Sequence, residues 1–200
     1  MRKERKLSFG RFIFELFIVF IGVYGAFELN RYQEAQREQK IREKYFITFR
    51  SELTKLIGSI RSADKAAIEE LEEIKNYNDS LKNKAFYPKT IIFNESLLIT
   101  QAGLNADVFV QLSPDLAASL IGGFDYVKSL ELLVNDFNRI TKDRLYGLKW
   151  GDLFDRDNQL KSEFLWYQNQ LELISDNLVR VGNMMEYQAG PFVDQIIADF

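Results

Sequence analysis

The chain opens with a long apolar run that gives way to a polar stretch and then to an apolar stripe. Residues 12–27 are apolar apart from Glu15, and this run approaches the ~20 residues that a helix needs to cross a ~30 Å hydrocarbon layer. Residues 30–44 are mostly polar and contain neither glycine nor proline, so no local signal ends the helix there. We therefore predict a transmembrane helix over residues 12–29 that continues into a long helical rod over residues 30–83.

Within the rod, apolar residues recur at spacings of mostly three and four, which is the pattern of a helix with one buried face. The stripe comprises Ile41, Tyr45, Phe49, Leu53, Leu56, Ile60, Ala63, Ala67, Leu71, Ile74 and Leu81. Ala63 and Ala67 narrow this stripe, which favours close packing against helices of the same domain over a plain two-stranded coiled coil. The four glutamates between residues 69 and 73 are interpreted as a solvated face.

Beyond the rod, the sequence contains start and stop signals for several further helices. A turn over residues 83–90 ends the rod, and residues 94–103 form a short helix between an asparagine cap and a glycine. The pair Ser113-Pro114 then marks the start of another helix, because proline is favoured at the first helical position. Gly122-Gly123 is interpreted as a junction where that helix ends and the next begins.

The last long helix has the most regular pattern of the chain. From Leu160 to Met185, apolar residues follow one another at spacings of three and four, so this helix belongs to the core. The pair Gly190-Pro191 ends it. No segment shows a sustained alternation of apolar and polar residues, and little or no sheet is expected. The predicted fold class is all-α: an N-terminal transmembrane helix continues into a long helix that packs in an antiparallel helical bundle, whose remaining helices lie within residues 84–200.

Charge on the two sides of the apolar run predicts its orientation in a membrane. Residues 1–11 form a basic segment with a single acid, whereas residues 28–44 carry five basic and four acidic side chains. The basic side chains of the first segment are Arg2, Lys3, Arg5, Lys6 and Arg11. Because positive charge is retained in the cytoplasm, we expect a cytoplasmic N-terminus in a bacterial inner membrane and an exported C-terminal domain, periplasmic or extracellular. A cleavable signal peptide is the alternative, with a weak cleavage site at Val23 and Gly25.

One face of the predicted span combines a carboxylate with small residues. Glu15, Gly22 and Ala26 share this face, with Gly25 beside it, and small residues four apart let two membrane helices approach closely. We predict that this face is a helix–helix interface, either with a second copy of the chain or with another membrane subunit. Two other roles for Glu15 stay open: it carries protons, or it pairs with Arg11 and reaches the headgroups.

Composition excludes several classes of site. The 200 residues include no histidine and no cysteine, which removes disulfides, thiolate chemistry, histidine bases and the usual zinc ligands. The 26 basic residues nearly balance the 29 acidic ones, so no global charge favours nucleic acid. Residues 155–158 are interpreted as a turn, because the glycine and final glutamate of a calcium loop are missing. We predict no catalytic, cofactor-binding or metal-ligating residue, and no cofactor.

A small-molecule ligand has little support in the sequence. Helical domains bind ligands between their helices, and four aromatic side chains offer the material for such a cleft. They are Tyr126, Trp150, Trp166 and Tyr167. Aromatic residues at helical spacing are more often part of a core, and we interpret these four in that way.

The anchor resembles that of a large uncharacterised family of bacterial single-span membrane proteins. Residues 15–22 and residues 30–34 carry the resemblance: an acid opens the span, a glycine lies in its middle, and an asparagine–aromatic–acid cluster follows. Tyr32 stands where tryptophan is usual in that family. A weaker similarity comes from Gly103-Leu104 and from the leucines that follow at 112, 116 and 120. The resemblance implies the topology given above and an exported helical domain, and it supplies no catalytic residue.

Three functions are compatible with these features. The first is a non-enzymatic, membrane-anchored helical module that acts as a scaffold, sensor or accessory subunit of an envelope complex. The second is a membrane subunit coupled to the proton-motive force through Glu15. The third is a hydrolase with paired carboxylates, for which the sequence offers no constellation of residues. We favour the first, with the lipid bilayer and either itself or another membrane subunit as partners and no nucleic acid.

Overall fold

The computed structural model describes residues 9–93 and 114–200, with side chains from residue 13 to 93 and from 121 to 200. Helices account for nearly all regular structure in these ranges, and the described residues form two isolated bridges but no strand. The predicted all-α fold class is therefore confirmed. The short helix expected over residues 94–103 lies outside the described residues.

The first helix, α1 (Phe9–Lys75), is a single uninterrupted helix of 67 residues. The chain divides into two compact units, one of residues 1–44 with Phe200 and one of residues 45–199, and α1 belongs to both. The predicted span and rod are thus parts of one helix, which ends at Lys75 rather than near residue 83. A 3₁₀ turn, η1 (Asp79–Leu81), follows it.

The second unit contains two further long helices, and both pass through glycines that were expected to break them. Helix α3 (Pro114–Leu145) starts at the predicted proline but runs on through Gly122-Gly123, so the predicted junction is wrong. Each glycine costs a helix only about 1 kcal/mol relative to alanine, which the packing of a long buried helix outweighs. A β-carbon at Gly123 would lie in ordinary van der Waals contact with the methyl carbon of Met185, at 3.5 Å, so α3 packs closely on the turn after α5 at this point.

Helix α5 (Leu165–Met184) likewise does not end at Gly190-Pro191. It continues through a π turn, η3 (Met185–Ala189), directly into α6 (Gly190–Ala198), so the predicted break is wrong. Proline lacks an N–H group and its ring clashes with the carbonyl four residues earlier in a regular helix. The wider π turn that precedes Pro191 accommodates it without ending the helix.

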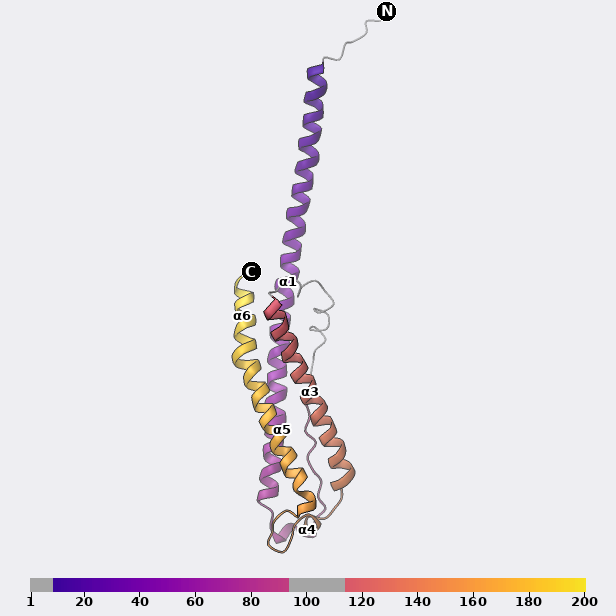
Figure 1. Ribbon diagram of the computed structural model, residues 1–200, viewed down its shortest axis with the longest axis vertical. Coiled ribbons are helices and arrows are strands. Elements are labelled where there is room, and N and C mark those ends of the chain that lie inside the picture. The colour runs from indigo at the N-terminus through magenta and orange to yellow at the C-terminus, as the bar shows by residue number, and fades with distance from the viewer. Residues whose placement is uncertain (1–8, 94–113) are drawn as a thin grey trace, which may run out of the picture. The chain divides into compact units, whose positions relative to one another are not determined.

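The helices of the second unit run in mixed directions (Figure 1). Helix α5 is antiparallel to both α3 and the bundle part of α1, as predicted. Helices α1 and α3 run in the same direction, because residues 82–93 carry the chain back between them: residues 82–84 form a turn and a bend, and residues 86–93 have no helix or turn. We call residues 82–93 the strap. The short α4 (Trp150–Leu153) and a 3₁₀ turn, η2 (Ser162–Phe164), connect α3 to α5.

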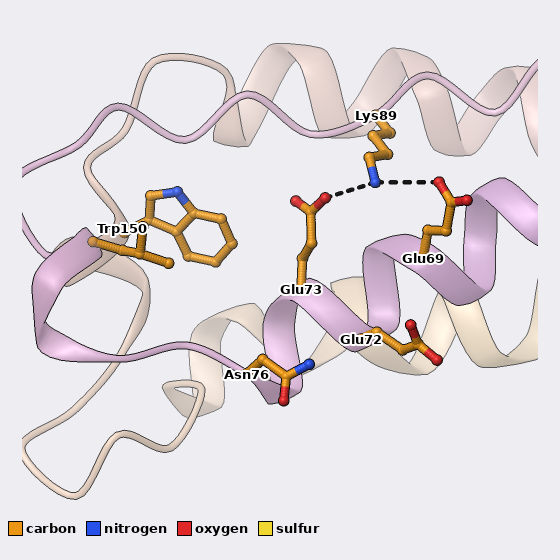
Figure 2. Close-up of a pocket in the computed structure, with 7 residues that line it drawn as sticks. Glu69, Glu72, Glu73, Asn76, Lys89 and Trp150 are labelled. Carbon is orange, nitrogen blue, oxygen red and sulfur yellow. Dashed lines mark hydrogen bonds and ion pairs between the residues drawn. The ribbon is translucent and has the colours of Figure 1, made fainter.

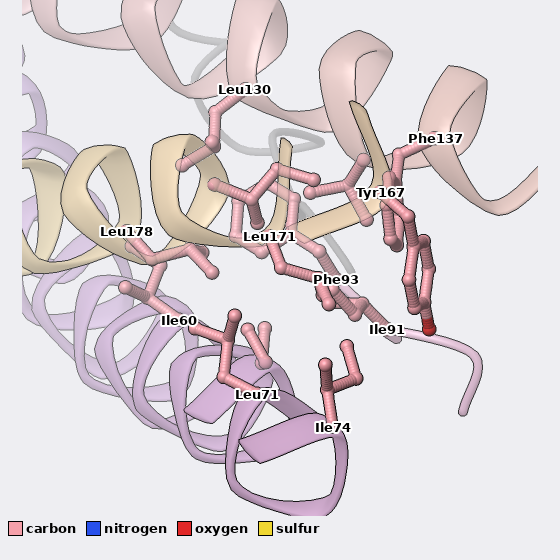
Figure 3. Packing of buried hydrophobic residues seen from close by; sticks show 14 of the residues in the cluster. Ile60, Leu71, Ile74, Ile91, Phe93, Leu130, Phe137, Tyr167, Leu171 and Leu178 are labelled. Carbon is pink, nitrogen blue, oxygen red and sulfur yellow. The ribbon is translucent and has the colours of Figure 1, made fainter. Parts of the chain in front are cut away.

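The core is formed where α1, α3, α5 and the strap meet (Figure 3). Most of the predicted stripe on α1 is buried there: Leu53, Leu56, Ile60, Ala63, Ala67, Leu71 and Ile74. Phe49 is buried in a separate cluster with Phe46 and with Val193 of α6. Ile41 is exposed and Tyr45 and Leu81 are half-buried. The packing is close, since a β-carbon on Gly182 of α5 would lie 3.2 Å from the Ile60 side chain. Each fully buried leucine or isoleucine contributes about 1.5–3 kcal/mol.

Candidate functional site

The residues predicted to form the membrane-helix interface lie on α1 with exposed side chains. An 18-residue window of this helix has a mean hydropathy of 1.7 and no buried residue, so α1 is long and apolar enough to cross a membrane. Glu15, Gly22, Gly25 and Ala26 are all exposed, and nothing lies within 4 Å of a β-carbon built on either glycine. Because the segment is helical throughout, Glu15, Gly22 and Ala26 share a face by periodicity.

The residues predicted to set the topology are described only in part. Arg2, Lys3, Arg5 and Lys6 lie outside the described residues, and Arg11 lies in α1 without a described side chain. The role that pairs Glu15 with Arg11 therefore stays a prediction.

A second concentration of polar groups lies around the strap. An extended segment outside a sheet leaves its backbone N–H and C=O groups without ladder partners, and burial of such groups is costly. Here the side chain of Asn138 on α3 replaces a neighbouring strand. Its carbonyl oxygen accepts from the Ile91 N–H over 3.0 Å, and its amide donates to the Ile91 carbonyl over 2.7 Å. Three apolar side chains anchor the strap in the core: Phe86, Ile91 and Phe93.

The turn after α3 holds the other end of the strap. Phe86 donates its backbone N–H to Leu148 over 2.6 Å and accepts from the Gly147 N–H over 3.0 Å. Gly147 has a φ of +83°, a conformation that glycine adopts without a steric penalty. The Trp150 N–H donates to the Lys84 carbonyl over 3.0 Å, so α4 is tied to the strap as well.

The prediction of an exposed side chain is wrong for Glu70. It was assigned to a solvated face, but its side chain is only 1% exposed. The Tyr167 hydroxyl donates to its Oε1 over 2.7 Å and the Lys89 backbone N–H to its Oε2 over 3.3 Å. A signal was available: Leu56, Ala63, Glu70 and Tyr77 follow one another at intervals of seven, which places Glu70 in a heptad core position.

The surroundings of this carboxyl change its titration. Burial raises the pKa of Glu70 above its ordinary value of 4.5, while the hydrogen bonds from Tyr167 and Lys89 oppose that change. Burial, followed by the neighbouring Glu70, raises the pKa of the Tyr167 hydroxyl far above its usual range. Tyr167 thus remains a donor at any physiological pH, and Glu70 links α1, α5 and the strap at one point.

Next to Glu70, an open groove of about 590 Å³ is lined by acidic residues of α1 and by the strap (Figure 2). We call it the acidic groove. The Lys89 ammonium lies between two carboxylates, 2.6 Å from Glu73 and 3.4 Å from Glu69. The hydrogen bond to Glu73 raises the pKa of Lys89, so the lysine stays charged. The carboxylate of Glu72 lies apart from it, and the Trp150 indole lies beside Glu73.

The acidic groove contains a clamp between the strap and α1. Its lysine joins the strap to α1, and both carboxylates facing it are paired with that lysine. No group of three or more histidine, cysteine, aspartate or glutamate side chains within the described ranges is placed to hold a metal ion. The arrangement therefore fixes the position of the strap against α1.

The four aromatic residues considered for a ligand cleft do not converge. Trp150 and Tyr167 are buried in the core, whereas Tyr126 is exposed on α3. Trp166 is half-buried, with the Arg144 guanidinium 5.7 Å from its ring centre. The turn predicted over residues 155–158 is present. Asp155 Oδ1 accepts from the backbone N–H groups of Asp157 and Gln159, each over 2.9 Å.

Comparison with known proteins brings no further assignment. The chain matches no protein family model, no curated protein and no solved structure. The residues and their geometry are thus the basis for inferring its function.

Proposed function

We propose that this protein is a non-enzymatic helical module, anchored in a membrane by one span, that acts as a scaffold, sensor or accessory subunit of an envelope complex. The observation that carries this proposal is the uncovered apolar segment of α1. Its large apolar side chains from Ile13 to Leu29 are 49–70% exposed. Contiguous apolar surface of this kind is unfavourable in water, and lipid or another membrane helix covers it.

The charge pattern and the continuity of α1 support a retained anchor with a cytoplasmic N-terminus. The basic side chains of residues 1–11 precede the apolar segment, as expected for the cytoplasmic side of a bacterial inner membrane. Helix α1 continues without interruption through Gly25, the weak cleavage site. A signal peptidase needs an accessible, extended cleavage site, and an unbroken helix disfavours one.

We also propose that the protein associates with its partner through one face of the span. Gly22 and Ala26 present little side chain, so a second helix can approach the α1 backbone closely along their face. Glu15 on the same face would then meet polar groups of a partner instead of lipid, which lowers the cost of placing a carboxylate in the membrane.

Membrane extraction and site-directed crosslinking test the proposal. We expect the full-length chain to remain with membranes after alkaline extraction and to be labelled at added cysteines only on the exported side beyond residue 44. The native chain has no cysteine, so Ala26→Cys gives an unambiguous disulfide dimer if two copies associate through this face. Tyr24→Cys, on the opposite side of the helix, is the matched control.

Two results would contradict the proposal. Release of the chain by alkaline extraction, or loss of its first residues by cleavage, would rule out the anchor. Equal crosslinking at positions 24 and 26, or crosslinking at position 26 that survives Gly22→Leu, would rule out the interface.

An ion-coupled subunit is the alternative that Glu15 itself favours, because it is the one acidic side chain in the apolar run of residues 12–27. If Glu15 carries protons, Glu15→Gln abolishes the activity of the host complex under an imposed proton gradient and leaves crosslinking at position 26 unchanged. Glu15→Asp, which keeps the titratable group, then retains activity. Loss of crosslinking in Glu15→Gln assigns the residue to assembly instead.

A further inference from the structure

A hollow of about 580 Å³ lies between the strap and the C-terminal end of α3. Residues 88–90 of the strap form one wall and side chains from residues 138–146 form the other. The lining includes the cationic side chains of Lys89, Arg139 and Lys142 and contains no carboxylate. We call this space the basic hollow. Its charge is opposite to that of the acidic groove, although Lys89 lines both.

Only part of this positive charge is balanced by neighbouring carboxylates. Lys89 is paired across the acidic groove, and Arg139 donates to Asp136 over 2.7 Å. Among the side chains that the structure describes, Lys142 forms no salt bridge. The negative end of the α3 dipole opposes a bound anion, but that effect is weaker than one charge-assisted hydrogen bond. Arg139 also faces Asp143, so Lys142 is the cation of the hollow whose charge is left for an anion.

A buried hydroxyl without a partner marks the wall of the hollow. Thr141 lines the hollow and is 3% exposed, and its Oγ1 has no hydrogen-bond partner among the described residues. Hydroxyls in helices usually donate to the carbonyl four residues earlier. Thr54 and Ser129 do so, over 3.0 Å and 2.8 Å. Buried polar groups are nearly always satisfied, so the unpaired Thr141 hydroxyl lacks an acceptor. Its Oγ1 is itself covered from solvent, so an acceptor in the hollow reaches it only when the side chain turns toward the hollow.

The rim of the hollow carries an aromatic wall. Tyr146 lines it and packs edge to face with Tyr87 of the strap, with ring centres 5.0 Å apart. Both rings remain 60% exposed. Exposed aromatic faces beside cationic groups bind the flat or apolar part of a ligand while the cations bind its charge.

We propose that the basic hollow binds a small organic oxyanion. The oxyanion, a carboxylate or a phosphate, receives hydrogen bonds from Lys142 and Arg139 and accepts from the Thr141 hydroxyl, while the organic part of the ligand packs on Tyr146. This binding site goes beyond the anchoring role and does not depend on the membrane span. It supplies the folded domain with a ligand site that joins the strap to α3.

Binding is tested with the full-length chain in detergent micelles, with benzoate and inorganic phosphate as probes at equal ionic strength. We expect at least one probe to bind, measured by calorimetry, and Lys142→Ala to weaken its binding about tenfold. Lys128→Ala is the matched control, since Lys128 is an exposed lysine of α3 that does not line the hollow. If benzoate binds more tightly than phosphate, Tyr146→Leu removes that preference.

The Thr141→Val variant distinguishes a hydroxyl that binds the ligand from one with a purely structural role. Valine has the shape of threonine without the hydroxyl, so the ligand-free variant melts at a higher temperature because an unpaired buried group has been removed. The same variant binds the probe more weakly. A lower melting temperature of the ligand-free Thr141→Val variant would mean that the hydroxyl is satisfied within the protein, and would overturn the proposal.

Two further results would also overturn it. One is that neither probe binds the wild-type chain. The other is that the probe binds Lys142→Ala and Thr141→Val, each verified as folded by circular dichroism, as tightly as it binds Lys128→Ala. The second result would place the bound anion elsewhere on the protein.

Discussion

At the scale of single residues, Glu70 shows why composition and local pattern misassign a buried acid. It stands in a run of glutamates, three of which do lie on the surface of α1, so the local pattern indicates solvent. Its burial depends on Tyr167 and Lys89, which are distant in sequence and supply hydrogen bonds only once the fold has formed. The intervals of seven from Ala63 to Glu70 and from Glu70 to Tyr77 are the sequence signal for its burial.

The buried carboxyl makes stability depend on pH in a direction that can be derived. The folded pKa of Glu70 lies above its ordinary value of 4.5, so between these two values the folded state binds more protons than the unfolded state. Stability from this group is fully present below 4.5 and is lost as pH rises through the folded pKa. Urea unfolding above pH 4.5 should therefore show a smaller fall in stability with pH for Glu70→Gln than for the wild type.

The matched control for this experiment is Glu72→Gln, an exposed position on the same helix, which should keep the wild-type slope. Asp194, whose pKa is lowered chiefly by its hydrogen bond with Arg50, acts in the opposite direction. Because Asp194 is present in all three proteins, its effect cancels in the comparison. Identical slopes for Glu70→Gln and the wild type would mean that Glu70 is not protonated more readily in the folded state.

Alanine substitutions at two glycines should change the stability of the protein in opposite directions. Gly58 lies on the exposed side of α1 with nothing within 4 Å of a β-carbon, so Gly58→Ala should stabilise the protein by about 0.5–1 kcal/mol. A β-carbon at Gly151 would lie 3.0 Å from the Lys82 backbone oxygen, so Gly151→Ala should destabilise it. Chemical denaturation of both variants measures the two effects, and a shift of the same sign in both would contradict the packing described.

At the scale of elements, the sequence predicts what local periodicity determines and misses what distant contacts determine. The stripe on α1, the start of α3 at Pro114 and the register of α5 follow from spacing and capping, and the structure confirms them. The continuation of α3 through Gly122-Gly123 and of α5 through Gly190-Pro191 depends on packing and on a π turn. The local sequence predicts neither of these two continuations.

The strap is the clearest case of an element without a local signal. Residues 83–90 were expected to be a turn, because asparagine, lysine and proline occur there. Residues 83 and 84 do lie in a turn and a bend, but no turn follows from Ala85 to Phe93. Near the end of this segment, Asn138 of α3 pairs with both backbone groups of Ile91. Asn138, whose side chain takes the place of a neighbouring strand, lies 47 residues from Ile91 in the sequence. No local sequence pattern predicts a pairing over that distance.

Asn138→Ala tests the importance of this pairing. The substitution leaves two backbone groups of a buried strap residue unpaired, so the free energy of unfolding should fall by about 2–4 kcal/mol. Limited proteolysis should then cut within residues 82–93 first. Asn135→Ala, an exposed asparagine one turn earlier on α3, should leave both measurements unchanged. Equal losses in the two variants would show that the strap does not depend on the Asn138 amide.

At the scale of the whole chain, the division at residue 44 separates an uncovered apolar segment from a unit with its own core. A fragment of residues 45–199 should therefore be soluble in water without detergent, be largely helical and unfold in one cooperative transition. The full-length chain should require detergent. Circular dichroism and sedimentation test both statements, and an aggregated or non-cooperative fragment would show that the bundle needs the N-terminal segment to fold.

The close approach of α5 to α1 has a consequence for the chain while it is being made. Ile60 emerges from the ribosome first, and Gly182, its neighbour in the folded core, follows more than a hundred residues later. At about 5–20 residues per second, the stripe on α1 waits on the order of ten seconds for its partner. During that interval α5 cannot cover it, so we expect the nascent chain to need chaperones or slow, ordered delivery to avoid aggregation.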